Sequence, residues 1–331
     1  MKAVVVKGRG LFEVSDVDKP AIGPGEVLVR ITKASLCYRD ILQLKGYYPR
    51  MRYPVVLGHE AVGVVEESLD PRFRPGERVV PILYSVDGVC DMCIRGEEVY
   101  CRSRLSYGEE VDGFFAQYAK VNANSLVKVP DYVDDYLASI TPCVVAMVYK
   151  GLRRAGLRRG ETVLVTGAGG GVGIHAVQVA KALGARVIAV TSHGEKAGEL
   201  SNYADHVIVG PGFHDAAKAL TDGGVDIVVE AVGTPTINES LRSLRQGGRL
   251  VLIGNVNPDE ALNLRLGYVI LKDIAIIGNI ASNKSDVVEA FRLAKYIRAV
   301  KAGEYGLGEF QDALNQLMNQ RRIGKIYINP W

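Results

Sequence analysis

Strand-like and helix-like apolar patterns alternate along the middle of the chain, from Glu161 onward. Apolar and β-branched runs predict six strands, at 162–166, 186–191, 206–209, 225–232, 249–254 and 274–280. Apolar residues at helical spacing predict helices at 172–183, 196–204, 213–220 and 237–244. Buried parallel strands are almost continuously apolar, and segments 187–190 and 226–229 nearly are. The alternation predicts an α/β fold with a doubly wound parallel sheet.

The segments on either side of this region have a different pattern. Residues 1–125 are rich in Val, Gly and Pro and alternate weakly at 27–31 and 61–66, which predicts a small β-domain. After the sheet region, the pattern predicts a helix at 286–299 and a strand at 326–328. We expect this tail to return to the first domain, so that residues 1–144 and 282–331 form the β-domain and residues 145–281 the sheet domain.

Composition narrows the function classes. The chain has 331 residues, which suggests two domains, and its 48% hydrophobic and 23% charged residues exclude a disordered protein. The net charge of only +3 argues against a dedicated nucleic-acid binder. The apolar runs are too short for a membrane helix, and residues 1–6 resemble a strand rather than an export signal. A cytoplasmic protein that binds a small-molecule substrate, with no membrane or nucleic-acid partner, is therefore expected.

A glycine-rich segment, 167–173, joins the first predicted strand of the sheet to its first helix. Glycines let a pyrophosphate approach the unpaired N–H groups at a helix N-terminus. Ala168 occupies the first place of the G-x-G-x-x-G pattern, so the match is imperfect. A flexible turn would also be glycine-rich, but the surrounding strands favour a dinucleotide site. The residues predicted to bind the cofactor here are Gly169, Gly170, Gly171 and Val172.

The end of the second predicted strand indicates which dinucleotide is bound. NAD sites usually place a carboxylate there for the ribose 2′-hydroxyl, whereas this chain has Thr191, Ser192 and His193, followed by Lys196. Hydroxyl, imidazole and ammonium groups suit a 2′-phosphate. Glu195 could instead reach the ribose. The pattern predicts NADP(H) in preference to NAD(H).

Three of the five cysteines lie within twelve residues, in a polar loop. Cys90 and Cys93 have the C-x2-C spacing with which two thiolates chelate one zinc ion, and Cys101 supplies a third. Asp87, three residues before Cys90, is the predicted fourth ligand, and Glu97 and Glu98 are the alternatives. The odd number of cysteines disfavours a disulfide framework. We therefore predict a structural Zn²⁺ site.

A second group consists of Cys37, Asp40, His59, Glu60 and Cys143. Two thiols, an imidazole and a carboxylate could form a catalytic zinc site with three protein ligands and a water. Spacing alone is weak evidence, because a single histidine is often structural and Cys143 lies in an apolar stretch typical of a core.

Together these motifs resemble the medium-chain dehydrogenase/reductase superfamily, zinc-type alcohol dehydrogenase family, over the whole chain. The segments 37–40, 46–54 and 263–268 are most similar to the archaeal acryloyl-coenzyme A reductase branch. The resemblance implies a GroES-like domain (1–144 and 282–331) and a Rossmann domain (145–281). It implies catalytic zinc ligands Cys37, His59 and Cys143, an exchangeable Glu60, and an Asp40 that orients the histidine. It also implies structural ligands 87, 90, 93 and 101, cofactor contacts at Gly233, Asn255 and Lys325, and a homodimer or homotetramer formed through strand 274–280.

Two departures from the family pattern open alternatives. Tyr38 replaces the usual Ser, Thr or His of the proton relay, and Arg39 beside it could pair with Glu60 or meet an anionic substrate group. Ala168 is similar to quinone and enoyl reductases, many of which need no catalytic metal. The leading hypothesis is an NADP(H)-dependent alcohol dehydrogenase or carbonyl reductase. The alternatives are an enoyl-thioester reductase that needs no catalytic zinc, with Tyr38 as acid, and a binding protein without turnover.

Overall fold

The middle of the chain folds into a six-stranded parallel sheet in the computed structural model, which describes residues 1–319 and 321–331. Within these residues, the sheet order is β13-β12-β11-β14-β15-β16. The strands are β11 (Thr162–Val165), β12 (Arg186–Thr191), β13 (His206–Val209), β14 (Val225–Glu230), β15 (Leu244–Leu252) and β16 (Ala275–Gly278). This order, with β11 and β14 adjacent at the centre, is that of a doubly wound dinucleotide-binding fold. The predicted α/β fold class is confirmed.

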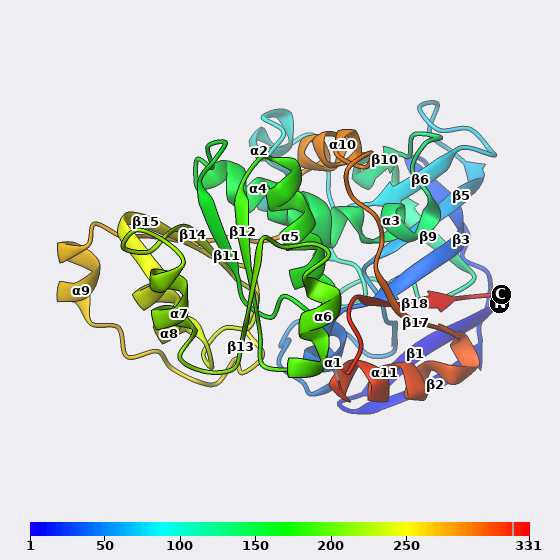
Figure 1. Cartoon of the computed structure of the whole chain (residues 1–331). Helices are drawn as coiled ribbons and strands as arrows, with labels where there is room; N and C mark the ends of the chain where they lie inside the picture. The colour runs from blue at the N-terminus through cyan, green and yellow to red at the C-terminus, as the bar shows by residue number, and fades with distance from the viewer. Residues whose placement is uncertain (320) are drawn as a thin grey trace.

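Helices cover both faces of this sheet, in the left half of Figure 1. They are α5 (Gly171–Ala182), α6 (Ala197–Leu200), α7 (Phe213–Ala219), α8 (Ile237–Ser243) and α9 (Leu266–Leu271), and the 3-10 turn η4 (Gly194–Lys196) precedes α6. The helix predicted at 196–204 is wrong in length: it is this 3-10 turn plus one helical turn. Gly198 lies inside it, and a helix-interior glycine is destabilising. Strand 225–232 ends earlier than predicted, because the Glu230 carboxylate accepts hydrogen bonds from the N–H groups of Val232 and Gly233.

Largely antiparallel sheets make up the other half of the molecule, which we call the antiparallel half although β17 and β18 pair in parallel. One has the order β10-β6-β5-β3-β18-β17, with β9 also paired to β3, and a smaller sheet has the order β2-β1-β4. Strands β7 and β8 form a separate pair. The strands are β1 (Lys2–Gly8), β2 (Leu11–Asp16), β3 (Glu26–Leu36), β4 (Val55–Val56), β5 (Ala61–Ser68), β6 (Arg78–Pro81), β7 (Tyr84–Ser85), β8 (Leu105–Ser106), β9 (Tyr118–Asn122) and β10 (Leu126–Lys128).

Short helices connect these strands to each other and to the parallel sheet. They are α1 (Tyr38–Leu44), α2 (Asp91–Ile94), η1 (Glu98–Tyr100), η2 (Ala123–Ser125), α3 (Asp135–Ile140), η3 (Thr141–Val145) and α4 (Ala146–Arg154). The segment η3 is a π-helical turn, and Pro142 within it has no N–H to donate. Such turns interrupt α-helices at functional sites. This one places Cys143 between the two halves of the molecule.

The tail returns to the antiparallel half. It contains α10 (Lys284–Arg292), β17 (Lys301–Gly306), η5 (Leu307–Glu309), α11 (Phe310–Asn319) and β18 (Lys325–Asn329). Strand β18 pairs with β3, so the tail completes a sheet begun by the first residues (Figure 1). The helix predicted at 286–299 begins earlier, at the Asn283 capping box, and ends at Arg292. Beyond Arg292 the backbone forms tighter turns, which bury Ile297 and Val300.

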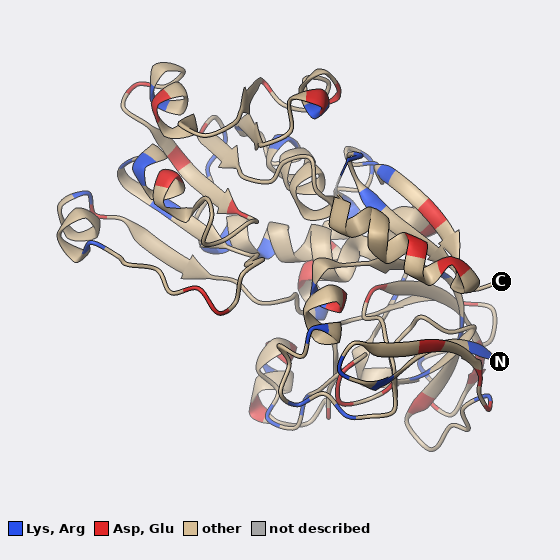
Figure 2. Ribbon diagram, turned by 90° about the horizontal axis from the view of Figure 1, so that it is seen from below, with Lys and Arg blue, Asp and Glu red and all other residues tan. Residues whose placement is uncertain are grey.

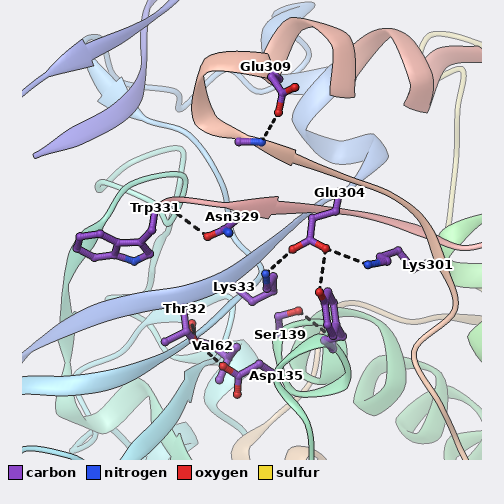
Figure 3. A network of polar contacts seen from close by, with 12 residues as sticks. Thr32, Lys33, Val62, Asp135, Ser139, Lys301, Glu304, Glu309, Asn329 and Trp331 are labelled. Carbon is purple, nitrogen blue, oxygen red and sulfur yellow. Dashed lines mark hydrogen bonds and ion pairs between the residues drawn. The ribbon is translucent and has the colours of Figure 1, made fainter.

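A polar network connects the returning tail to β3 and α3 of the antiparallel half (Figure 3). The Glu304 carboxylate on β17 accepts hydrogen bonds from Lys33 of β3, from Tyr136 of α3 at 2.8 Å and from Lys301 at 2.9 Å. Partial burial acts to raise the pKa of Glu304, but these donors outweigh it and lower the pKa to about 2. The network therefore stabilises the attachment of β17 to β3 and α3 while Glu304 is ionised.

Charged residues of both signs are interspersed over the ribbon (Figure 2). Among residues 1–319 and 321–331, the helices are all too short or too polar to cross a membrane.

Candidate active site

A cavity of about 880 Å³ lies between the two halves. The antiparallel half contributes Cys37, Tyr38, His59 and Cys143 to its wall. The Rossmann half contributes the glycine turn and the segments that follow β12, β14 and β15, at the carboxyl ends of these parallel strands. Ligands of doubly wound sheets bind at this edge. The cavity therefore brings the predicted cofactor residues and the predicted reacting groups to one place.

Cys37, His59, Glu60 and Cys143 converge on one wall of the cavity, although three separate elements carry them. Their ligand atoms all lie within 4.8 Å of one another. Cys37 caps α1, His59 and Glu60 directly precede β5, and Cys143 lies on the π-helical turn. The chain separation of these elements is why spacing alone could not predict their convergence.

Asp40 orients two members of this cluster. One of its oxygens lies 3.0 Å from His59 Nδ1, and the other accepts the backbone N–H of Cys37 at 2.8 Å. Since Nδ1 faces a carboxylate, His59 Nε2 is the nitrogen left for another partner. Both Nε2 and Glu60 Oε1 are buried without a hydrogen-bond partner. Buried polar atoms of this kind are costly unless a ligand satisfies them.

The donor set fits a zinc ion. Two sulfurs, an imidazole nitrogen and a carboxylate oxygen are the atoms that Zn²⁺ prefers, and the buried atoms without partners belong to this set. The hydrogen bond with Cys143 lowers the pKa of the Cys37 thiol well below its ordinary value, and the charge of Lys325 adds to this effect. The thiolate favoured in this way is the form that binds metal.

Lys325 is the ion-pair partner of Glu60. Its Nζ lies 2.6 Å from Glu60 Oε2 and donates to the Leu36 carbonyl at 2.8 Å. The pairing of Arg39 with Glu60 considered from the sequence is therefore wrong: Arg39 lies 2.6 Å from Glu109 instead. The side chain of Lys325 is only 3% exposed and is the cation that contacts Glu60. The two residues are 265 positions apart in the sequence, so no local pattern indicated that they would pair.

The polar loop forms a second compact cluster. The ligand atoms of Asp87, Cys90, Cys93 and Cys101 lie within 4.8 Å of one another. A hydrogen bond from Ser103 and the N–H groups of Cys90 and Val89 lower the pKa of Asp87, which keeps it an anion. The alternative ligands lie elsewhere: Glu97 pairs with Arg95, and Glu98 with Lys284. The donor set of three thiols and one carboxylate fits a closed tetrahedral zinc site.

The glycine turn has the shape that a pyrophosphate requires. Helix α5 begins at Gly171, and Gly167 has a φ of +58°. A Cβ at Gly173 would lie 2.1 Å from the Gly167 carbonyl oxygen, so only glycine fits there. Gly169, Gly170, Gly171 and Val172 all line the cavity.

Other predicted cofactor residues surround this turn. Asn255, Lys325, Thr191, Ser192, His193 and Lys196 line the cavity. Gly233 does not; it has a φ of +99° and lies directly against Asn255. Glu195 does not line the cavity either: its side chain is 60% exposed and lies 3.4 Å from His193. Lys196 is buried beside Gly169, and this burial lowers its pKa.

On the substrate side of the cavity, sequence reasoning considered Arg39 but missed Arg104 and Glu109. The Arg39 guanidinium lies 5.0 Å from the ring centre of Tyr48 and is held by Glu109, which is buried. Arg104 lies 5.2 Å from the ring centre of Tyr84. Only the position of Arg39, two residues after Cys37, gave a signal in the sequence, because Arg104 and Glu109 belong to an irregular loop without a motif.

Comparison with known proteins agrees with this arrangement. Residues 23–131 match the alcohol dehydrogenase GroES-like domain, and residues 171–295 match the zinc-binding dehydrogenase domain. The chain therefore belongs to the zinc-type alcohol dehydrogenase family of medium-chain dehydrogenases/reductases, and it is an NAD(P)-dependent oxidoreductase.

Individual relatives show which members of the family this chain is similar to. The chain is 53% identical to an acryloyl-coenzyme A reductase of Metallosphaera sedula, over 99% of both chains. It is 50% identical to an acryloyl-coenzyme A reductase of Sulfurisphaera tokodaii, over 100% of both. A crystal structure of an NAD-dependent alcohol dehydrogenase superposes with a TM-score of 0.92 at 28% identity, over 100% of both chains.

Proposed function

We propose that this protein reduces the carbon–carbon double bond of a short 2-enoyl-CoA thioester, such as acryloyl-CoA, with NADPH. The observation that carries the proposal is the identity of 50–53% with two acryloyl-coenzyme A reductases over essentially the whole chain. The preference for an alcohol or carbonyl substrate that the sequence suggested is not confirmed, and the enoyl-thioester alternative fits these relatives better.

The reaction is a conjugate reduction. A hydride passes from C4 of the nicotinamide to C3 of the enoyl group, the electron pair of the double bond moves toward the thioester oxygen, and a proton then reaches C2. The products are the saturated thioester and NADP⁺. The cavity suits this order of steps because both the glycine turn and the substrate-side residues line it.

We assign the proton to the Tyr38 phenol. Tyr38 follows Cys37 directly, opens α1 and lines the cavity. General acids in such positions contribute about 10²–10⁴-fold to the rate. The Arg39 guanidinium, fixed by Glu109 and Tyr48, is a cation on this wall that can donate hydrogen bonds to the thioester oxygen.

We also propose zinc at both clusters. Zinc held by Cys37, His59 and Cys143 would supply a Lewis acid for the thioester carbonyl. Asp40 orients the imidazole, and Lys325 balances the Glu60 carboxylate. Zinc at the Asp87 cluster would hold the loop 87–101 in place, since four protein ligands leave no open coordination position for a substrate.

NADP(H) is the proposed cofactor. Around the end of β12, the cavity is lined by Thr191, Ser192, His193 and Lys196, and Glu195 points away from it. Burial disfavours the charged form of Lys196, and a 2′-phosphate beside it would stabilise the ammonium by supplying an anionic partner.

A homo-oligomer formed through β16 is part of the proposal. Strand β16 is an edge strand of the parallel sheet, and Ile276 on it is 38% exposed. An exposed apolar edge strand is typical of a surface that pairs with another sheet. Sedimentation of a concentration-independent monomer would contradict this part.

The decisive experiment compares substrates. Loss of NADPH absorbance is followed with acryloyl-CoA and with a panel of aldehydes, ketones and alcohols. We expect the largest kcat/KM for the enoyl thioester, with propionyl-CoA as product. A larger kcat/KM for any ketone or aldehyde would overturn the proposal and restore the carbonyl-reductase alternative.

A further inference from the structure

The outer wall on the substrate side of the cavity is both basic and aromatic. Segment 45–53 forms it, and within this segment Tyr47, Tyr48, Pro49 and Arg50 line the cavity. Lys45, Arg50 and Arg52 are exposed at its outer surface. Tyr47 and Tyr53 are exposed to 37% and 42%. Cations beside exposed aromatic rings suit a ligand that carries both phosphate and a base.

A fourth cation reaches this wall from the turn between β1 and β2. Arg9 packs on Gly46, where an added Cβ would lie 2.7 Å from Arg9 Nε. We call Arg9, Lys45, Arg50 and Arg52, with Tyr47 and Tyr53, the basic rim.

The charge of the basic rim is largely uncompensated. In the described part of the chain, Arg9, Lys45 and Arg52 form no ion pair. Arg50 lies 3.6 Å from Glu110 and 3.9 Å from Glu109, and Glu109 is already paired with Arg39. Asp259 lies beside the Tyr47 hydroxyl, so it faces the rim as well. Three cations therefore remain for an external anion.

The rim lies at a defined distance from the reacting groups. Helix α1 begins directly after Cys37 and ends at Leu44, and seven residues of α-helix span about 10 Å. The backbone of Lys45 thus lies roughly 10 Å from that of Cys37, whereas Tyr48 turns back toward Arg39. The pantetheine arm of coenzyme A contains two amide units and a cysteamine, and it is comparable in length with about four extended residues, roughly 14 Å. An acyl group at Cys37 would place the far end of this arm at the rim.

We propose that the basic rim binds the 3′-phospho-ADP end of the coenzyme A thioester. This inference rests on the proposed function, because it names the part of the same substrate that lies outside the cavity. The phosphates contact Arg9, Lys45 and Arg52, and the adenine stacks on an exposed tyrosine ring. The rim therefore distinguishes a coenzyme A thioester from a short thioester with the same acyl group.

The test compares two substrates that share the reacting atoms. Steady-state KM values are measured for acryloyl-CoA and for acryloyl-pantetheine, which lacks the nucleotide. We expect a lower KM for acryloyl-CoA and a steeper rise of this KM with ionic strength. The variant R9Q/K45Q/R52Q should raise the KM for acryloyl-CoA about tenfold, since each exposed ion pair contributes modestly. The ratio of the two KM values should then approach one.

A matched control removes three charges at the amino ends of the parallel strands, the end opposite the cavity. Arg158, Arg159 and Arg186 are exposed near the amino ends of β11 and β12, and they form no ion pair among the described residues. The variant R158Q/R159Q/R186Q should keep the wild-type ratio of KM values. Circular dichroism and NADPH binding check that both triple variants are folded.

The outcomes separate the two proposals. Equal KM values for both thioesters in the wild type, or an equal rise of both in the rim variant, would overturn the inference while leaving the reductase proposal intact. Failure to reduce either thioester would contradict the proposed function. In that case calorimetric titration with propionyl-CoA decides the inference: binding that weakens in the rim variant supports it, and no binding, or equal binding to the variant, overturns it.

Discussion

His175 provides a pH-dependent contribution to stability whose size can be worked out from its surroundings. It lies in α5, fully buried, with Nδ1 donating to the Gly171 carbonyl at 2.7 Å. Nε2 accepts the backbone N–H of Val300 at 3.1 Å, which ties the glycine turn to the start of β17. Only the neutral imidazole can make both bonds. Burial, together with the charge of Lys325, lowers the pKa of His175 from 6.5 to about 4.

The sign and the magnitude follow from this shift. Because the unfolded chain takes up a proton at a higher pH than the folded protein, stability falls as the pH drops from 6.5 toward 4. The full difference of pKa corresponds to about 3 kcal/mol, and about 2 kcal/mol of it should already be lost at pH 5. His175→Gln removes the titrating group and keeps both a donor and an acceptor.

The assay is urea unfolding of wild type and H175Q from pH 7 to pH 5, followed by circular dichroism. Other acid-sensitive groups, the zinc clusters included, are common to both proteins, so only the difference between their pH profiles reports His175. The wild type should lose about 2 kcal/mol more than the variant over this range. Parallel profiles would show that the imidazole is not held neutral, and the reasoning from burial would be wrong.

Four other predictions follow from the site and the fold. Elemental mass spectrometry should find two zinc ions per chain, and Cys143→Ala should lose one of them; a wild type with a single zinc would contradict the metal assignment for the cavity. Tyr38→Phe should lower kcat for acryloyl-CoA about 100-fold or more with little change in KM, as expected for a lost general acid; an unchanged kcat would assign the proton to another donor. Lys196→Ala should raise KM for NADPH about tenfold or more and leave KM for NADH nearly unchanged, because a charged phosphate contact is lost; equal effects on both cofactors would remove the basis for the NADP(H) preference. Glu304→Gln should lower the free energy of unfolding at pH 7 by about 1–2 kcal/mol, discounted for partial exposure. That difference should persist down to pH 4.5 and disappear toward pH 2, since the ionised carboxylate is the stabilising form; a difference that does not change over that pH range would exclude the ion-pair explanation.

The parallel sheet could be predicted because its signals are local. Strands such as 162–166 and 186–191 are apolar runs bounded by turns, and a buried parallel strand needs nothing else. The helix predicted at 196–204 was too long, because the apolar spacing of this segment is helical while Gly198 weakens a helix. Helix α10 ends at Arg292 although apolar residues continue beyond it, and Ile297 is buried from the non-helical segment that follows.

The same distinction applies to the site. The four residues of the 87–101 loop are close in sequence, so their spacing alone indicated that they would meet. Cys37, His59 and Cys143 come from distant segments, and only a resemblance to a family placed them together. The partners of the two central charges could not be predicted at all. Glu60 pairs with Lys325 and Arg39 with Glu109, contacts between distant segments that the tertiary fold of the antiparallel half brings together.

The position of β18 between β3 and β17 has a consequence for protein synthesis. The strand that carries Lys325 is inserted between β17, which is made shortly before it, and β3, which is made much earlier. Until the ribosome has released this strand, Glu60 lacks its counterion and the glycine turn lacks the side chain that lies against Gly171. A nascent chain that has completed its Rossmann sheet is therefore still without a finished active site. Chains interrupted before β18 would therefore remain inactive.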